Sequence, residues 1–158
     1  MLASACDFRV ACEKTHFAIP EIKLGIPLTW GALPRLVRDI GATKTKELVM
    51  LGSRFTSEDA YRMGFLNRIV EHDAKGLLLQ GATRKLCQEL CLMSRLTLRM
   101  TKRSVDAIAS HMVQTRTASW ADASHLVAAS LDRESSEVRE RYIKHLAEGK
   151  SRRRKSRL

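Results

Sequence analysis

The distribution of proline and glycine divides this chain into two parts that must fold differently. All three prolines and five of the eight glycines lie between Met1 and Val70. Proline and glycine interrupt regular structure, so this part is expected to form short elements joined by turns. Beyond residue 73 the apolar residues recur at helical spacing. We therefore expect an α/β core at 1–72, a helical region at 73–149 and a basic tail at 150–158.

Short strands and short helices are expected to alternate in the first part. Thr56 can cap the first amides of a helix, Asp59 lies favourably near its positive end, and Gly64 supplies a left-handed stop. The other expected elements are strands at 8–11 and 66–70 and helices at 31–40 and 44–51. This alternation is typical of an α/β layer structure.

The second part predicts four amphipathic helices. Apolar residues recur every three or four positions over 78–90, 98–112, 120–131 and 138–146. An apolar stripe on a helix has to be covered. We expect these stripes to pack on one another, on the α/β core or on another subunit.

The net charge of +11 is concentrated in the tail. Six of these positive charges follow Gly149, which leaves +5 for the rest of the chain. A solvated, disordered end accounts for such a tail, and RNA binding through it is a weaker hypothesis. No apolar run of about eighteen residues and no signal-peptide pattern is evident, so we expect an intracellular protein without a membrane span.

The cysteines and histidines do not form a recognisable metal or nucleophile motif. Cys87 and Cys91 are four residues apart on one expected helix, where two half-buried thiols are the simplest interpretation. No Cys-x-x-Cys pair or matching histidine spacing accompanies them. We expect reduced cysteines, no metal and no cofactor.

Several consecutive motifs resemble the crotonase (enoyl-CoA hydratase/isomerase) family. The resemblance is continuous over about seventy residues, in the order and at the spacing of that family. It continues more loosely into the helices, through Met100-Thr101-Lys102. The motifs that carry it are Leu2-Ala3-Ser4-Ala5-Cys6-Asp7, Phe17-Ala18-Ile19-Pro20-Glu21-Ile22-Lys23-Leu24-Gly25-Ile26, Trp30-Gly31, Pro34-Arg35-Leu36, Phe55-Thr56-Ser57-Glu58-Asp59-Ala60 and Arg62-Met63-Gly64-Phe65-Leu66-Asn67.

The resemblance implies a partial crotonase-like ββα spiral followed by a carboxy-terminal helical region that forms trimers or hexamers. Members of the family bind acyl-CoA thioesters, which are substrates and not cofactors. Two backbone amides hold the thioester oxygen as it gains negative charge, and carboxylates move protons nearby. The implied reaction is hydration or a double-bond shift of an enoyl-CoA in fatty-acid β-oxidation. The alternative is a non-catalytic crotonase-like subunit that acts in assembly.

Glu21 falls on one of the two catalytic glutamate positions of the family. The sequence around it agrees, because a carboxylate after Pro20 and between apolar residues would be partly desolvated. From periodicity alone, an exposed turn or a structural ion pair would explain Glu21 better. The motif reverses that preference.

Three departures from the family pattern narrow the expected chemistry. Met1 falls on the other glutamate position, and a single carboxylate suits a double-bond shift better than hydration. Leu28-Thr29 replaces the usual proline and glycine before a turn. The oxyanion-hole segments of the family precede the position of Leu2, so we expect an incomplete chain with little catalysis of its own.

Three further features are candidate sites. Lys102 and Arg103 resemble a region of the family where basic side chains approach CoA, although a solvated helix face also explains them. Trp30 could line an acyl pocket, but we expect it to anchor its turn to the core. Ser156-Arg157-Leu158 resembles a peroxisomal targeting tripeptide; the expected location is otherwise cytoplasmic or mitochondrial.

Overall fold

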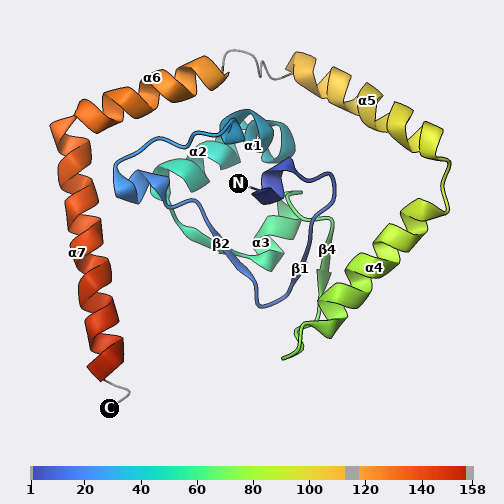
Figure 1. The fold of residues 1–158 in the computed structure, drawn as a ribbon, viewed down its shortest axis with the longest axis horizontal. Coiled ribbons are helices and arrows are strands. Elements are labelled where there is room, and N and C mark those ends of the chain that lie inside the picture. The colour runs from blue at the N-terminus through green and yellow to red at the C-terminus, as the bar shows by residue number, and fades with distance from the viewer. Residues whose placement is uncertain (1, 113–117, 156–158) are drawn as a thin grey trace.

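The computed structural model describes residues 2–112 and 118–155, and it has an α/β core with a helical region on two sides of it (Figure 1). The core contains two 3₁₀ turns, four short strands and three helices: η1 (Leu2–Ala5), β1 (Val10–Cys12), β2 (His16–Ala18), η2 (Glu21–Leu24), α1 (Ala32–Ile40), α2 (Ala42–Leu51), β3 (Arg54–Thr56), α3 (Ser57–Arg62) and β4 (Arg68–Val70). Four longer helices follow: α4 (Leu77–Cys91), α5 (Arg95–Met112), α6 (Ala118–Leu131) and α7 (Arg133–Lys155).

The strands form two separate pairs. β1 pairs in parallel with β4, with Ala11 opposite Ile69, and β2 pairs antiparallel with β3, with Phe17 opposite Phe55. Phe17 also stacks on Phe55 at 5.4 Å between ring centroids and meets the edge of Phe65 at 6.0 Å. These aromatic contacts join the β2–β3 pair to the turn after α3.

Helix α3 begins where the sequence predicts. The Thr56 hydroxyl accepts a hydrogen bond from the Asp59 amide, and the Asp59 carboxylate accepts one from the Thr56 amide. This reciprocal capping box satisfies amides that the helix itself leaves unpaired. Gly64 follows the end of α3 with a φ of 82°, as the predicted left-handed stop.

The buried apolar residues all belong to the α/β core. They are Ala11, Leu28, Ala32, Leu36, Leu48, Ala60, Phe65 and Leu66. No residue described after Leu66 is fully buried, and several large apolar side chains of α4 to α7 are exposed. The apolar stripes of α4 to α7 were expected to pack on one another, on the α/β core or on another subunit. The α/β core covers only part of their apolar surface.

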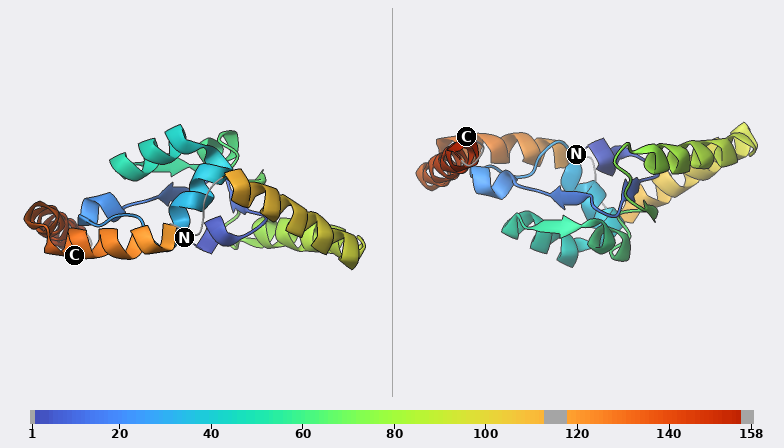
Figure 2. Two further views of the ribbon diagram at one scale, coloured as in Figure 1. Left: turned by 90° about the horizontal axis from the view of Figure 1, so that it is seen from above. Right: turned by 90° about the horizontal axis from the view of Figure 1, so that it is seen from below.

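The helices lie in two pairs on opposite sides of the core (Figures 1 and 2). Helix α4 packs against β1 and β4, and Arg68 bonds Glu89 across this contact at 3.2 Å. Helix α7 packs on η2. Helix α7 also continues past Gly149 to Lys155, so the helix does not end at the glycine where the basic tail begins. A single glycine inside a helix costs about 1 kcal/mol, which neighbouring residues can offset.

None of the helices in the described ranges is long and apolar enough to cross a membrane.

Candidate functional site

Glu21 is the first residue of the 3₁₀ turn η2 and directly follows Pro20. The Ile26 amide donates to the Glu21 carbonyl at 3.2 Å, and the Gly25 amide donates to Ile22 at 3.1 Å. Gly25 closes the turn with a φ of 65°, a conformation that glycine adopts without strain. The turn thereby fixes the backbone from which the Glu21 side chain projects.

The Glu21 side chain reaches a small, mostly apolar cavity of about 110 Å³, which we call the Glu21 chamber. Its Oε2 atom is buried and accepts no hydrogen bond from any residue in the described ranges. An unpartnered carboxylate oxygen is costly in such surroundings, so it is available to a group that enters the chamber. The chamber is lined mainly by Phe17, Ile19, Leu28, Ala32, Leu36, Leu48, Phe55 and Phe65.

These surroundings do not fit either simpler explanation of Glu21, which were an exposed turn and a structural ion pair. The residue is partly buried rather than exposed, and the ion pairs found in the described residues do not include it. Its catalytic role remains a prediction. The position, however, is one in which a carboxylate can exchange a proton with a bound molecule.

A larger groove of about 1050 Å³ lies between residues 4–9, helix α1 and helix α5; we call it the α1/α5 groove. Its walls combine apolar side chains with charged ones of both signs. Cavities of this size accommodate small organic ligands. The charged lining residues are Asp7, Arg9, Arg35, Arg38, Asp39, Lys102 and Asp106.

Lys102 lines this groove and forms an ion pair with Asp7. The hydrogen bond to Asp7 raises the pKa of Lys102, so the ammonium stays charged. Arg103, the neighbouring candidate, is exposed and does not line the groove. Of the two basic residues that the sequence indicated as candidates for CoA binding, only Lys102 therefore lines the groove.

Glu21 and Lys102 line different cavities. The two cavities share one lining residue, Ser4 of η1, which is only 4% exposed. Ser4 is a serine among small residues, a pattern that carries no functional signal of its own. Its position between the chamber and the groove becomes evident only in the fold.

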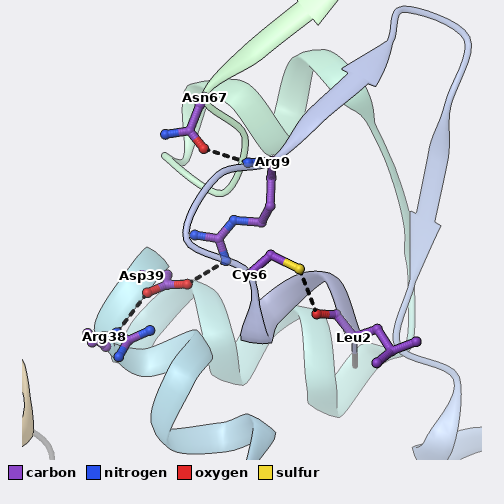
Figure 3. A network of polar contacts seen from close by, with 6 residues as sticks. All are labelled: Leu2, Cys6, Arg9, Arg38, Asp39 and Asn67. Carbon is purple, nitrogen blue, oxygen red and sulfur yellow. Dashed lines mark hydrogen bonds and ion pairs between the residues drawn. The ribbon is translucent and has the colours of Figure 1, made fainter. Parts of the chain in front are cut away.

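A partly buried ion pair stabilises the wall of the groove (Figure 3). Arg9 Nη1 bonds Asp39 Oδ2 at 2.7 Å, and Arg38 Nε bonds Asp39 Oδ1 at 3.0 Å. The Arg9 guanidinium also lies 4.6 Å from the centre of the Phe65 ring. The backbone amide of Arg9 donates a hydrogen bond to Asn67 Oδ1 at 2.8 Å. These contacts tie the start of β1 to the end of α1, and the sequence pattern did not predict them.

Leu28 and Trp30, which lie before helix α1, have opposite exposures. Leu28 is 3% exposed and lines the Glu21 chamber, so it supplies an apolar wall. Trp30 has a φ of 67° and is 81% exposed. The expectation that Trp30 anchors its turn to the core is therefore wrong, because the left-handed backbone directs the indole outward. Met1 lies outside the described residues.

Comparison with known proteins identifies relatives that are named enoyl-CoA hydratases. The short-chain-enoyl-CoA hydratase of Clostridioides difficile is 36% identical over 104 residues, which are 66% of this chain and 64% of that protein. A probable mitochondrial enoyl-CoA hydratase of Dictyostelium discoideum is 39% identical over 106 residues, 67% of this chain and 37% of that protein. The chain thus spans between about a third and two thirds of the length of these relatives.

A solved structure gives the same result for the fold. Enoyl-CoA hydratase from Bacillus halodurans superposes with a TM-score of 0.75 at 27% identity, over 88% of this chain and 53% of that one. This similarity confirms the predicted partial α/β fold of the crotonase type. The family model for enoyl-CoA hydratase/isomerase matches residues 1–147, and this chain therefore belongs to the enoyl-CoA hydratase/isomerase family.

Proposed function

We propose that this chain contributes the acid/base carboxylate of an acyl-CoA site, with Glu21 as the group that transfers the proton. The observation that carries the proposal is the buried Oε2 atom of Glu21, which has no hydrogen-bond partner among the described residues and belongs to a residue that lines an apolar chamber. A carboxylate in such a place can take a proton from a bound acyl group and return it. The names of the relatives support an enoyl-CoA as substrate.

We propose a double-bond shift as the reaction that suits this chain best. A single carboxylate can remove a proton from one carbon and deliver it to another, whereas hydration also requires an activated water. Leu28 adds to this preference, because its buried side chain makes one wall of the chamber apolar. Parallel assays of 3-enoyl-CoA isomerisation and 2-enoyl-CoA hydration distinguish the two reactions, and faster hydration would favour the hydratase.

The α1/α5 groove is our candidate for the CoA part of the substrate. Lys102 is the groove residue that the sequence analysis associated with CoA, and an ammonium can bond a phosphate oxygen. No role is assigned to Arg103, because it does not line the groove. The shared residue Ser4 would then lie where the CoA and acyl parts of the substrate meet.

The test of this function is turnover of an enoyl-CoA by the Glu21→Gln variant. Because this chain covers 53% of the Bacillus halodurans enzyme, it is assayed both alone and fused behind the amino-terminal half of that enzyme. Whichever of these two forms turns over an enoyl-CoA is called the active form. In the active form, Glu21→Gln should abolish turnover and leave the circular dichroism spectrum of the folded protein unchanged. The matched control is Glu58→Gln, an exposed glutamate on α3. Undiminished turnover by Glu21→Gln would refute the assignment.

A second candidate function is assembly without catalysis. It is favoured by the exposed apolar side chains on the long helices and in the turn between α4 and α5, among them Leu92, Met93, Leu96, Leu126 and Leu131. A purely assembling subunit predicts self-association in size-exclusion chromatography and no change in melting temperature with CoA thioesters. The catalytic proposal predicts that a CoA thioester raises the melting temperature.

We also propose a peroxisomal location and a place in fatty-acid β-oxidation. The support is the terminal Ser156-Arg157-Leu158, which lies outside the described residues, together with the acyl-CoA chemistry of the relatives. A fluorescent protein fused before this chain should reach peroxisomes, and deletion of 156–158 should release it. A distribution that does not respond to the deletion would contradict the proposal.

A further inference from the structure

Helix α6 caps helix α1 from a distant part of the chain. Helix α1 begins at Ala32, and the preceding Gly31 has no side chain with which to bond the first amides. Asp122 on α6 performs this function, because its Oδ2 atom accepts a hydrogen bond from the Gly31 amide at 2.8 Å in a partly buried position. A carboxylate at the amino end of a helix is favourable both as an acceptor and through the helix dipole.

The capped turn is conformationally unusual. Trp30 and Gly31 adopt left-handed conformations in succession, with φ values of 67° and 61°. Trp30 is the one non-glycine residue in the described ranges with a positive φ. Such a conformation costs on the order of 1 kcal/mol for a bulky residue and persists where other contacts hold it. The Asp122 bond to Gly31 and the Arg35 bond to the Trp30 carbonyl, at 3.3 Å, are such contacts.

Helix α7 holds the other end of the same segment. Arg139 Nε donates a hydrogen bond to the Leu24 carbonyl at 3.0 Å, also in a partly buried position. The backbone of Ser135 packs directly on Gly25, leaving no space for a side chain at position 25. Helices α6 and α7 are consecutive and packed together, and they bond the backbone of Gly31 and of Leu24, respectively.

The segment held in this way forms part of the Glu21 chamber. Glu21, Leu28 and Ala32 all line the chamber, and they lie at the start, middle and end of residues 21–32. Within this segment β-strand pairing is absent from the structure, so the backbone is held by local turns, by α2 packed on η2, and by the two helices α6 and α7. We infer that Asp122 and Arg139 are positioning residues, which set the chamber and the orientation of Glu21 through the backbone of residues 21–32.

This inference rests on the proposed function only for the chemistry of Glu21, so its test starts with a structural measurement. The exchange rates of single amide hydrogens are measured by NMR in the full chain. The Gly31 amide reports the Asp122 contact, and the Ile26 amide, which bonds the Glu21 carbonyl, reports the turn that carries Glu21. The Phe65 amide, bonded to Ala60 at 2.8 Å, reports the core.

Asp122→Ala should raise exchange of the Gly31 amide about tenfold, and Arg139→Ala should do the same for the Ile26 amide. The Phe65 amide should keep its rate in both variants. Asp122→Asn should restore much of the protection, because an amide oxygen still accepts a hydrogen bond. The matched control is Glu140→Ala, since this exposed glutamate neighbours Arg139 on α7. Unchanged Gly31 and Ile26 exchange, or an equal rise at Phe65, would overturn the inference.

A kinetic readout separates positioning from binding. In the active form, Asp122→Ala and Arg139→Ala should lower kcat about tenfold with KM nearly unchanged, because they displace the proton-transfer group and not the CoA contacts. A change confined to KM would overturn a role in positioning Glu21. If Glu21→Gln keeps full activity, the proposed function fails, whereas the exchange result for the two contacts still stands or falls alone.

Discussion

Gly25 and Ser135 approach so closely that a Cβ atom at position 25 would overlap the carbonyl oxygen of Ser135. Gly25 also has a φ of 65°, where side chains are strained. The residue that ends the Glu21 turn is therefore also the residue on which α7 rests. This contact depends on the absence of a side chain at position 25, so a single methyl group tests it.

Gly25→Ala should lower the free energy of unfolding by about 3 kcal/mol, from backbone strain and the forced displacement of α7. Chemical denaturation measures this loss. The matched control is Gly76→Ala, because Gly76 has a similar φ of 68° and open space around its Cα atom. The control should lose only about 1 kcal/mol. Equal losses in the two variants would show that α7 does not rest on Gly25.

The Arg9–Asp39 pair predicts a large effect of removing one partner. The side chains are 12% and 9% exposed, so Asp39→Ala leaves a largely buried guanidinium without its carboxylate. The expected loss is about 3 kcal/mol in the free energy of unfolding. Glu58→Ala breaks the exposed pair with Arg62 and should cost less than about 0.5 kcal/mol. Similar costs for both substitutions would contradict the structural role of the Arg9–Asp39 pair.

The capping box of α3 predicts a dependence of stability on acid. The hydrogen bond from the Thr56 amide, aided by the Thr56 hydroxyl, lowers the pKa of Asp59 below its ordinary value of 3.8. A lowered folded-state pKa gives stability that is complete above the unfolded-state pKa and is lost as pH falls through the folded-state pKa. Asp59→Asn should therefore flatten the fall in melting temperature below about pH 4.

Part of that acid dependence should survive in Asp59→Asn. Hydrogen bonds from Ser135 also lower the pKa of Asp132, so this residue contributes its own loss of stability as the pH falls. Glu140→Gln removes an exposed acid and is the control for a general change in charge. A profile for Asp59→Asn that is as steep as that of the unmodified chain would contradict the prediction.

Lys102 and Arg103 should differ in their effect on CoA binding. Lys102 lines the α1/α5 groove and Arg103 does not, so Lys102→Ala should weaken CoA binding about tenfold while Arg103→Ala leaves it unchanged. Isothermal titration with CoA measures both affinities, and the two variants control one another for loss of a positive charge. Equal weakening by both would indicate a general electrostatic effect and not a contact in the groove.

The sequence predicted the elements that have clear punctuation. Glycines at 41, 52 and 64 follow α1, α2 and α3, and all three take positive φ values. Apolar runs predicted β1 and β4. The sequence did not predict β2 and β3, because each has a single large apolar residue, Phe17 or Phe55, and no apolar run within its bounds. It also did not predict that α7 continues through Gly149, because a glycine late in a helical pattern commonly ends the helix.

The candidate site was predictable only where a motif carries it. Glu21 follows from its motif, and the structure adds its buried oxygen and its chamber. Asp122 and Gly31 are 91 residues apart and Arg139 and Leu24 are 115 apart, so no local pattern relates them. Trp30 is exposed and has a left-handed backbone, a conformation that a bulky residue such as tryptophan rarely adopts. These contacts arise from the tertiary arrangement of the helices.

The central claim is that Glu21 moves the proton. The most direct measurement is the incorporation of deuterium from heavy water into an enoyl-CoA, compared between the unmodified active form, Glu21→Gln and Glu58→Gln. Loss of a proton-transfer group lowers such rates by about 10²-fold or more. We predict a loss of this size for Glu21→Gln and no loss for Glu58→Gln. Deuterium incorporation by Glu21→Gln at the unmodified rate would contradict the claim.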